Sequence, residues 1–222
     1  MTERNGIMEY RTPKPLRKRR KRKGNISRLI VFAIFCFIIL ISGKWIISNL
    51  TSTWQMNKLE KAAVPDWVDA QIIAVDGDSR RGELMEGIND IVIHYVGTPG
   101  STAQQNHDYY SNPDSKVSSH FVIGLDGEII QCVPLNEKSS ASNWRNGDTI
   151  SIEVCHHDKK GKFTKKSYAS LVKLTAWLSK LCSLDANHII RHYDITGKKC
   201  PLYFVQHEDK WEQFKVDVTN NK

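Results

Sequence analysis

The sequence predicts an α/β fold with a single mixed β-sheet flanked by helices, preceded by one N-terminal transmembrane helix. Three observations lead to this prediction. Residues 29–43 form an uncharged apolar run, short apolar runs alternate with amphipathic segments after residue 90, and Asp126-Gly127 separates two of the short runs. Strands interleaved with helices are typical of a sheet with helices on its faces, and Asp-Gly between apolar runs is a strong hairpin signal.

The positive charge of the chain is confined to its N-terminus. The 222 residues carry a net charge of +8, but residues 1–28 hold eleven basic and two acidic residues, a net of +9. The rest of the chain is therefore close to neutral, which argues against a nucleic-acid-binding domain. At 40% hydrophobic and 25% charged residues, the chain has the composition of a globular protein with a core.

The N-terminal segments predict a membrane protein with its main domain outside the cell. We interpret residues 1–28 as a basic cytoplasmic tail and residues 29–47 as a signal-anchor helix close to the roughly 20 residues that a span needs. A cleaved signal peptide is the competing interpretation, but the apolar run is long for one and no small-x-small cleavage site follows it cleanly. The basic run at 17–23 also resembles a nuclear or nucleic-acid patch until the apolar run is considered.

The remaining chain divides into a stem and one domain. Residues 48–68 mix polar residues with scattered aromatic ones and are expected to form the stem, and residues 69–222 are expected to form the domain. Ile91–Tyr95 is a short apolar run after turn-prone residues, which favours a buried strand. Ser101 and Gln104 form a capping-box pattern that opens a helix extending to about Tyr110.

The second half of the domain continues the alternation. Apolar patterning predicts strands at 120–124, 128–133, 149–155 and 189–191, an amphipathic helix over 164–183 and a terminal helix over 207–218. The five cysteines show no C-x-x-C pair, and most of them are expected to be small buried hydrophobes. A disulfide among Cys132, Cys155 and Cys182 is possible, without any spacing that supports it. Nothing in the sequence specifies an oligomer.

The stretch Arg191–Pro201 carries the strongest chemical signal. It places His192 eight residues before Cys200 with Gly197 between them, and zinc accepts nitrogen and sulfur ligands of this kind. A third ligand must come from elsewhere, and His94 at the end of an apolar run is the candidate. A histidine at a position like that of His94 more often packs in the core than binds a metal. Neither the spacing between His192 and Cys200 nor the position of His94 is a compact metal-binding signature.

Other residues are candidates for chemistry beside the metal. Glu153 shares a strand face with Ser151 and Cys155, and a carboxylate in mid-strand is costly to bury unless it is paired or used. Lys198 is a second candidate because it lies only two residues before Cys200. The competing interpretation is an ordinary surface lysine, which is where this residue type usually lies. The adjacent His156 and His157 point in opposite directions on a strand, so a solvated turn is a better interpretation than a second metal site.

Four ordered stretches resemble a known family. They are I-V-I-H-Y (91–95), S-S-H-F-V-I-G-L-D-G-E-I-I-Q (118–131), T-I-S-I-E-V-C (149–155) and R-H-Y-D-I-T-G-K-K-C-P (191–201). They resemble the zinc-dependent N-acetylmuramoyl-L-alanine amidases of the type shared by bacteriophage T7 lysozyme, many phage endolysins and peptidoglycan recognition proteins. The resemblance covers most of the domain but not residues 1–68.

The resemblance implies roles for particular residues. It places zinc ligands on His94, His192 and Cys200, the catalytic carboxylate on Glu153 and a transition-state lysine on Lys198. The T7 type has a tyrosine where this chain has Ser119. Without that tyrosine, the Glu153 carboxylate is expected to carry more of the proton transfer. The implied reaction is hydrolysis of the amide between N-acetylmuramic acid and the L-alanine of the peptidoglycan stem peptide, a substrate outside the cytoplasmic membrane. Asn143, Trp144 and Arg145, in a polar loop before the Glu153 strand, are candidate contacts with the wall, and a plain loop is the competing interpretation.

Two other functions compete with a membrane-anchored amidase. One is a module that binds muropeptide without cutting it. Relatives that lack the cysteine ligand are binders, and the presence of Cys200 with Glu153 and Lys198 favours catalysis. The other is a structural zinc domain, which expects a fourth protein ligand, with His107, His120 and His188 as the available histidines.

Overall fold

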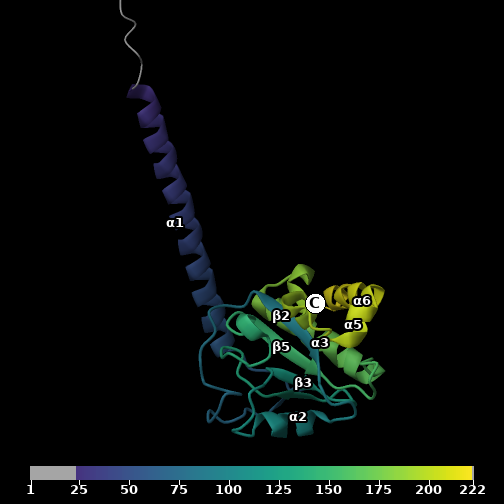
Figure 1. Ribbon diagram of the computed structural model, residues 1–222. Helices are drawn as coiled ribbons and strands as arrows, with labels where there is room; N and C mark the ends of the chain where they lie inside the picture. The colour runs from purple at the N-terminus through teal and green to yellow at the C-terminus, as the bar shows by residue number, and fades with distance from the viewer. Residues whose placement is uncertain (1–23, 222) are drawn as a thin grey trace, which may run out of the picture. The chain divides into compact units, whose positions relative to one another are not determined.

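A computed structural model describes residues 24–221, which divide into two compact units between Ile47 and Ser48. The basic tail predicted at 1–28 lies mostly outside the described residues. Helix α1 (Gly24–Glu60) runs through the predicted anchor (Figure 1). Its large apolar side chains there are exposed. Among the described helices, α1 alone is long and apolar enough to cross a membrane, a criterion that a secretion signal near the N-terminus also meets. The N-terminal apolar helix therefore indicates secretion or a membrane anchor.

The second unit is built on one mixed sheet, which confirms the predicted α/β class. Its strands are β1 (Asp69–Ala70), β2 (Asp90–Tyr95), β3 (Phe121–Ile123), β4 (Ile129–Gln131), β5 (Thr149–Val154) and β6 (Ile189–Arg191). They lie in the order β1-β4-β3-β5-β2-β6. The predicted hairpin is the antiparallel pair β3–β4, and every other neighbouring pair is parallel.

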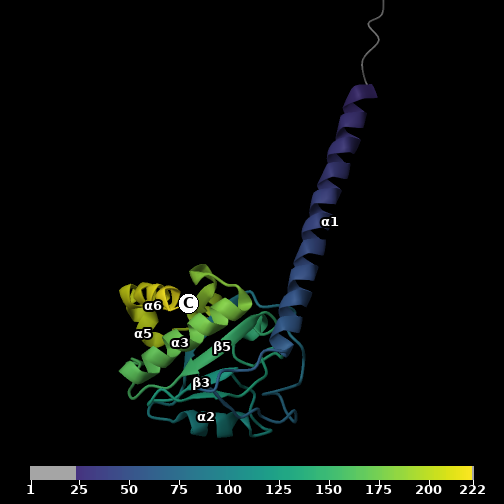
Figure 2. The ribbon, with the colours of Figure 1, turned by 180° about the vertical axis from the view of Figure 1, so that it is seen from behind.

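Helices cover the sheet and close its core. They are α2 (Ala103–Tyr110), α3 (Lys165–Cys182), α4 (His192–Thr196), α5 (Leu202–Gln206) and α6 (Glu208–Asn220), with short 3-10 turns η1 (Asn143–Arg145) and η2 (Ala186–His188). Helix α3 crosses the face of the sheet that Figure 2 presents, and the apolar side chains of α3, α5 and α6 pack with that face in the main core. A smaller core forms between α2 and the β3–β4 hairpin.

The alternation along β5 decides which residues reach the site. Ile150, Ile152 and Val154 are buried in the main core under α3. Successive side chains of a strand point to opposite faces, so Ser151 and Glu153 point away from that core. The same parity on β2 buries Ile91 and Ile93 and sends His94 to the face with Glu153.

The C-terminal turns of α1, within the second unit, are part of this domain's core. Leu59 is buried in the main core. The Gln55 amide donates to the carbonyls of Ile88 and Cys182 and accepts from the Ile88 N–H, and Lys58 donates to the Leu181 carbonyl. The beginning of the segment expected to be a stem thus packs as a helix that contributes apolar and polar contacts to the fold.

Several local predictions need correction. The helix cap is formed by Thr102 with Gln105, one residue later than expected, because the Ser101 hydroxyl donates to the Thr98 carbonyl instead. The terminal helix expected over 207–218 is present as α6, and it is preceded by the short helix α5, which was not expected. All five cysteines lie within the described residues and are free thiols, so the disulfide considered above does not form.

Candidate metal centre and active site

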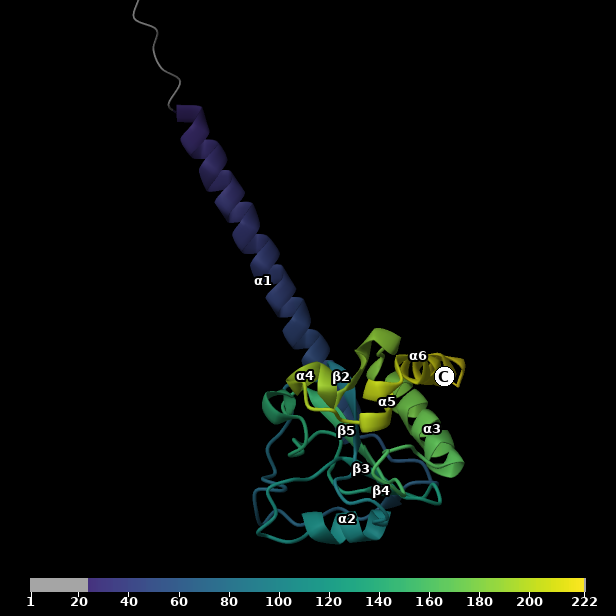
Figure 3. The same cartoon turned by 45° about the vertical axis from the view of Figure 1, so that its right-hand side comes forward.

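Three side chains from distant parts of the chain converge at one end of β2. His94 is the penultimate residue of β2, His192 is the first residue of α4, and Cys200 follows α4. Figure 3 shows α4 beside β2. One ligand atom from each of the three residues lies within 4.8 Å of those of the other two, and all three residues are buried. The sequence predicted this set, and the structure brings it together.

The chain between His192 and Cys200 folds as a short helix followed by a tight return, where a loop was expected. Gly197 ends α4 with φ of 75°, in the left-handed region that glycine adopts easily. The Tyr193 N–H then donates to the Cys200 carbonyl over 2.9 Å, which closes the return. The imidazole and the thiol are thereby held on the same side of the turn.

The chemistry of these groups fits a zinc ion. Burial is the main cause that lowers the pKa of both His94 and His192, so the rings are neutral and keep a lone pair. Burial also raises the pKa of the Cys200 thiol to about 12, so at neutral pH the thiol ionises only beside a cation. Among the described residues, His94 Nε2 is a buried nitrogen without a hydrogen-bond partner. Two imidazoles and a thiol are a ligand set that zinc accepts, leaving a fourth position open.

Glu153 lies next to this cluster. It is paired with His94 in the parallel register of β2 and β5, and His94 Nδ1 is 3.8 Å from Glu153 Oε1. Burial raises the pKa of the Glu153 carboxyl to about 8, although 18% of its side-chain surface remains exposed, and nearby Lys198 opposes that rise. Glu153 Oε2 has no hydrogen-bond partner among the described residues. Such a carboxyl is able to accept and return a proton near neutral pH.

Two cavities meet at the cluster. The first, of about 980 Å³, runs past the loop at 138–148, and the second, of about 780 Å³, contains His94, Glu153 and Cys200. Both are lined by His192 and Lys198. The candidate metal cluster therefore lies where two arms of a cleft join, an arrangement suited to a ligand that extends in two directions from the cluster.

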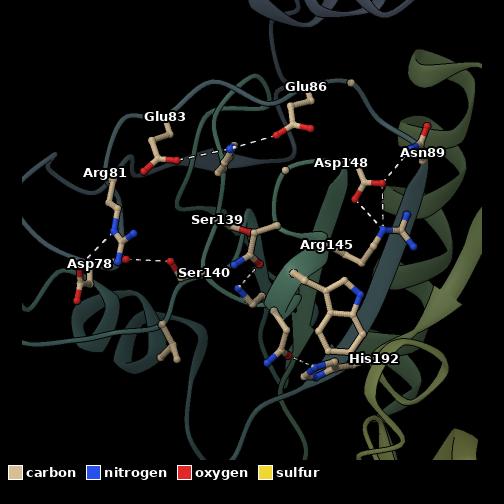
Figure 4. A pocket seen from close by; sticks show the side chains of 18 of the residues that line it. Asp78, Arg81, Glu83, Glu86, Asn89, Ser139, Ser140, Arg145, Asp148 and His192 are labelled. Atoms are coloured by element: carbon tan, nitrogen blue, oxygen red, sulfur yellow. Dashed lines mark hydrogen bonds and ion pairs between the residues drawn. The ribbon is translucent and has the colours of Figure 1, made fainter. Parts of the chain in front are cut away.

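The three predicted wall contacts line the first cavity but differ in what they contact. Trp144 is 73% exposed. Arg145 forms ion pairs with Asp90 and Asp148, which raise its pKa, and the Asp148 contact is visible in Figure 4. The Asn143 side-chain oxygen lies 2.8 Å from His192 Nε2. Trp144 is thus the one of the three whose side chain is mostly free to meet a ligand.

The other histidines are engaged elsewhere. His107 contacts the Gln71 carbonyl, His188 contacts Asp90, and His120 uses both ring nitrogens within the core. The only cluster of metal-ligating groups among the described residues is His94 with His192 and Cys200, so these residues supply no fourth ligand of a structural zinc site.

The expectation of a solvated turn at His156 is wrong. His156 is buried, stacks on Tyr95 with ring centroids 4.9 Å apart, and hydrogen-bonds the Val96 carbonyl. Only His157 is exposed. Strand β5 ends at Val154, so the alternation assumed for these two residues does not extend to them.

Two aromatic residues of the cleft were not anticipated. Tyr109 and Tyr110 at the end of α2 line the second cavity, Tyr109 largely exposed and Tyr110 buried. Tyrosine is common in cores and on surfaces alike, so the sequence held no signal that would place this pair at the site. Their position depends on how α2 packs on the β3–β4 hairpin.

Comparison with known proteins agrees with this geometry. The family model described as N-acetylmuramoyl-L-alanine amidase matches residues 85–202, a stretch that contains the three clustered residues and Glu153. The N-acetylmuramoyl-L-alanine amidase BlyA of Bacillus subtilis is 30% identical over 167 residues, and CwlL of Bacillus licheniformis is 28% identical over 163 residues. Each alignment covers 66% of this chain and 45% of the relative, so the chain spans less than half of their length.

Solved structures show the same relationship. An endolysin mutant from Bacillus subtilis is similar with a TM-score of 0.59 and 29% identity, covering 68% of this chain and 97% of that one. The catalytic domain of XlyA is similar with a TM-score of 0.60 and 27% identity. The match covers 68% of this chain and 98% of the XlyA domain. The matched family model extends over more than half of the sequence and includes all three residues of the candidate metal cluster. The chain belongs to the N-acetylmuramoyl-L-alanine amidase family.

Proposed function

We propose that this protein is a membrane-anchored, zinc-dependent peptidoglycan hydrolase that cleaves the amide between N-acetylmuramic acid and the L-alanine of the stem peptide. The observation that carries the proposal is the convergence of His94, His192 and Cys200 beside Glu153 at the junction of two cavities. His94, His192 and Cys200 are the proposed zinc ligands. When bound, zinc supplies Lewis acidity that polarises a carbonyl and lowers the pKa of water toward about 7.

Glu153 is the proposed acid–base group. Its carboxylate takes a proton from the attacking water and then gives it to the nitrogen of the leaving amine, so that the carbon–nitrogen bond breaks with a neutral amine as product. A carboxyl pKa of about 8 suits both halves of this transfer, because neither protonation state is strongly disfavoured near pH 7. No tyrosine is needed at Ser119, whose hydroxyl is buried and donates within the core.

Lys198 is the proposed stabiliser of the oxyanion that forms on the attacked carbonyl. It lines both cavities and is close enough to His94, His192 and Glu153 to influence the pKa of each. A preorganised cation is most effective where water is partly excluded. Trp144, exposed on the wall of the first cavity, is the proposed contact for the sugar or peptide that lies there.

The hydrolytic proposal is tested on purified cell walls with the full chain in detergent. We expect turbidity to fall, a chelator to stop the fall, and added zinc to restore it. Cleavage of the proposed amide releases new N-terminal alanine without new reducing sugar ends, which separates an amidase from a glycosidase. A chain that sediments with walls and leaves them intact would instead be a binding module.

The membrane anchor is a second part of the proposal. The apolar, exposed stretch of α1 is preceded in the sequence by the basic segment, a charge bias that favours a cytoplasmic N-terminus. The hydrolase domain would then face the wall. Protease added to intact spheroplasts should remove the domain while a cytoplasmic marker survives, and a protected domain would overturn this orientation. Release of the domain into the medium would indicate a cleaved signal peptide.

A further inference from the structure

We propose that Asn143 is a positioning residue for His192: its side-chain oxygen fixes the tautomer and orientation of the imidazole, so that Nδ1 is presented to the metal. The inference rests on the proposed zinc site. The distance between Asn143 Oδ1 and His192 Nε2 is 2.8 Å. An amide oxygen only accepts, so this contact requires the hydrogen on Nε2. A neutral imidazole protonated at Nε2 keeps its lone pair on Nδ1.

The backbone of Asn143 supports a dedicated role. Asn143 has φ of 56° and is one of two non-glycine residues with positive φ among the described residues. Asparagine tolerates this left-handed region better than most residues, whereas a β-branched or bulky residue would be strained there. The turn is closed by Asn146, whose side-chain oxygen accepts from the N–H groups of Ala141 and Ser142. The Asn143 side chain is thereby left to reach His192.

Arg145 ties this turn to the strands that carry the site. Its Nε lies 2.8 and 3.0 Å from the two carboxylate oxygens of Asp148, and its Nη2 contacts Asp90. Asp90 is the first residue of β2, the strand that holds His94, and the Thr149 hydroxyl at the start of β5 donates to the Arg145 carbonyl. The turn that carries the acceptor for His192 is therefore held by an ion pair to β2 and a hydrogen bond to β5, the strands that position His94 and Glu153.

This arrangement gives Asn143 a function different from the wall contact that the sequence predicts for it. A ring held by one outer hydrogen bond loses less rotational freedom on binding the ion and does not have to change tautomer. Removing such an outer partner of a metal-ligating histidine typically lowers metal affinity by about 10- to 100-fold. The effect is expected on zinc binding itself, before any substrate is present.

The test compares two substitutions in the full chain. Asn143→Gly removes the acceptor and keeps a residue that adopts positive φ easily, and Asn143→Asp keeps both the acceptor and the tolerance for positive φ. Ser183→Gly is the matched control, because Ser183 is the other left-handed position and lies at the end of α3. Zinc affinity is measured by competition with a chromogenic chelator.

We expect Asn143→Gly to weaken zinc binding about 10- to 100-fold, and Asn143→Asp and Ser183→Gly to stay within about threefold of the wild type. Proton–nitrogen correlation spectra of the zinc-loaded wild type should show His192 protonated at Nε2. Wild-type affinity in Asn143→Gly, or a His192 protonated at Nδ1, would overturn the inference while leaving the hydrolase proposal intact. A wild-type chain that binds no zinc would overturn both.

Discussion

His94 and Glu153 lie opposite each other on the parallel strands β2 and β5, with 3.8 Å between His94 Nδ1 and Glu153 Oε1. This pairing places a carboxyl with a pKa raised to about 8 beside the candidate metal-ligand cluster. The strand register thus puts the proposed acid–base group beside the proposed zinc site, and this arrangement underlies the first prediction.

Replacing Glu153 with Gln should abolish most hydrolysis while leaving the fold and the zinc content unchanged. Glutamine has a similar shape but cannot exchange a proton, so we expect the wall-lysis rate to fall by about 100- to 10,000-fold. Glu212→Gln, at an exposed position on α6, is the control and should behave as the wild type. Undiminished lysis by the Glu153 variant would remove this residue from the mechanism.

Lys198 and its neighbour Lys199 provide a matched pair. Both are exposed, but Lys198 lines both cavities and Lys199 lines neither. Because a cation near the developing oxyanion acts in the transition state, Lys198→Met should lower kcat by roughly 100-fold, and Lys199→Met should leave it nearly unchanged. Equal effects of the two substitutions on wall lysis would count against a specific role for Lys198.

Cys200 should be required for full zinc occupancy. Its thiol supplies the only sulfur of the cluster, so Cys200→Ser is expected to reduce zinc per chain measured by elemental analysis after dialysis. Cys182→Ala, at a buried cysteine on α3, should retain its zinc and shows whether loss of a buried thiol alone has an effect. Full zinc retention in Cys200→Ser would reject this residue as a ligand.

His120 should make the zinc-free protein less stable in acid. Its Nδ1 accepts from the Ser151 N–H and its Nε2 contacts the Glu137 carbonyl, and burial lowers its pKa to about 4. In the unfolded chain histidine has a pKa near 6.5, so the unfolded state binds the proton first as pH falls. The stabilising contribution is therefore complete above about pH 6.5 and is lost as pH falls toward 4.

The contribution of His120 is measured as a difference between variants. Between pH 7.5 and pH 5, the unfolding free energy of His120→Asn should fall by about 2 kcal/mol less than that of the wild type, with a chelator present in both cases. His157→Asn, at the exposed neighbour of His156, should follow the wild type. Parallel pH profiles for the wild type and His120→Asn would show that His120 titrates normally.

Trp144 should contribute to binding of the wall and not to the chemical step. Trp144 is exposed on the cavity wall. An indole that stacks on a substrate contributes about 1 kcal/mol to the free energy of binding. Trp144→Ala should therefore raise the half-saturating wall concentration roughly fivefold with little change in kcat. Trp144→Phe should recover most of the difference, and a large loss of kcat in Trp144→Ala would contradict this assignment.

Sequence reasoning succeeded where the signal is local. The alternation of Ile150, Ile152 and Val154 against Ser151 and Glu153 correctly sorted β5 into a core face and a site face. The helical spacing of apolar residues located α3, and Asp-Gly located the hairpin between β3 and β4. These features follow from backbone periodicity and turn chemistry, which a single segment contains in full.

It failed where a residue's surroundings come from distant segments. His156 looked like part of a solvated turn, yet Tyr95 and Val96 at the end of β2 bury it. The wall contacts predicted at Asn143 and Arg145 remain predictions, but nothing in the sequence indicated the hydrogen bond between Asn143 and His192 or the ion pair between Arg145 and Asp90. Those partners are remote in the sequence, and no local pattern reports on them.

The residue types available for the site can be read from the amino-acid order alone. The family resemblance adds which of them to suspect, namely His94, His192, Cys200, Glu153 and Lys198. The amino-acid order also determined that an uncharged apolar helix precedes the domain. That these residues meet depends on the folded chain, because the parallel pairing of β2 with β5 and β6 brings three distant strands together. The same packing sets how the candidate ligands are supported. The hydrogen bond from His192 to Asn143 depends on where these segments lie in space and not on their order along the chain.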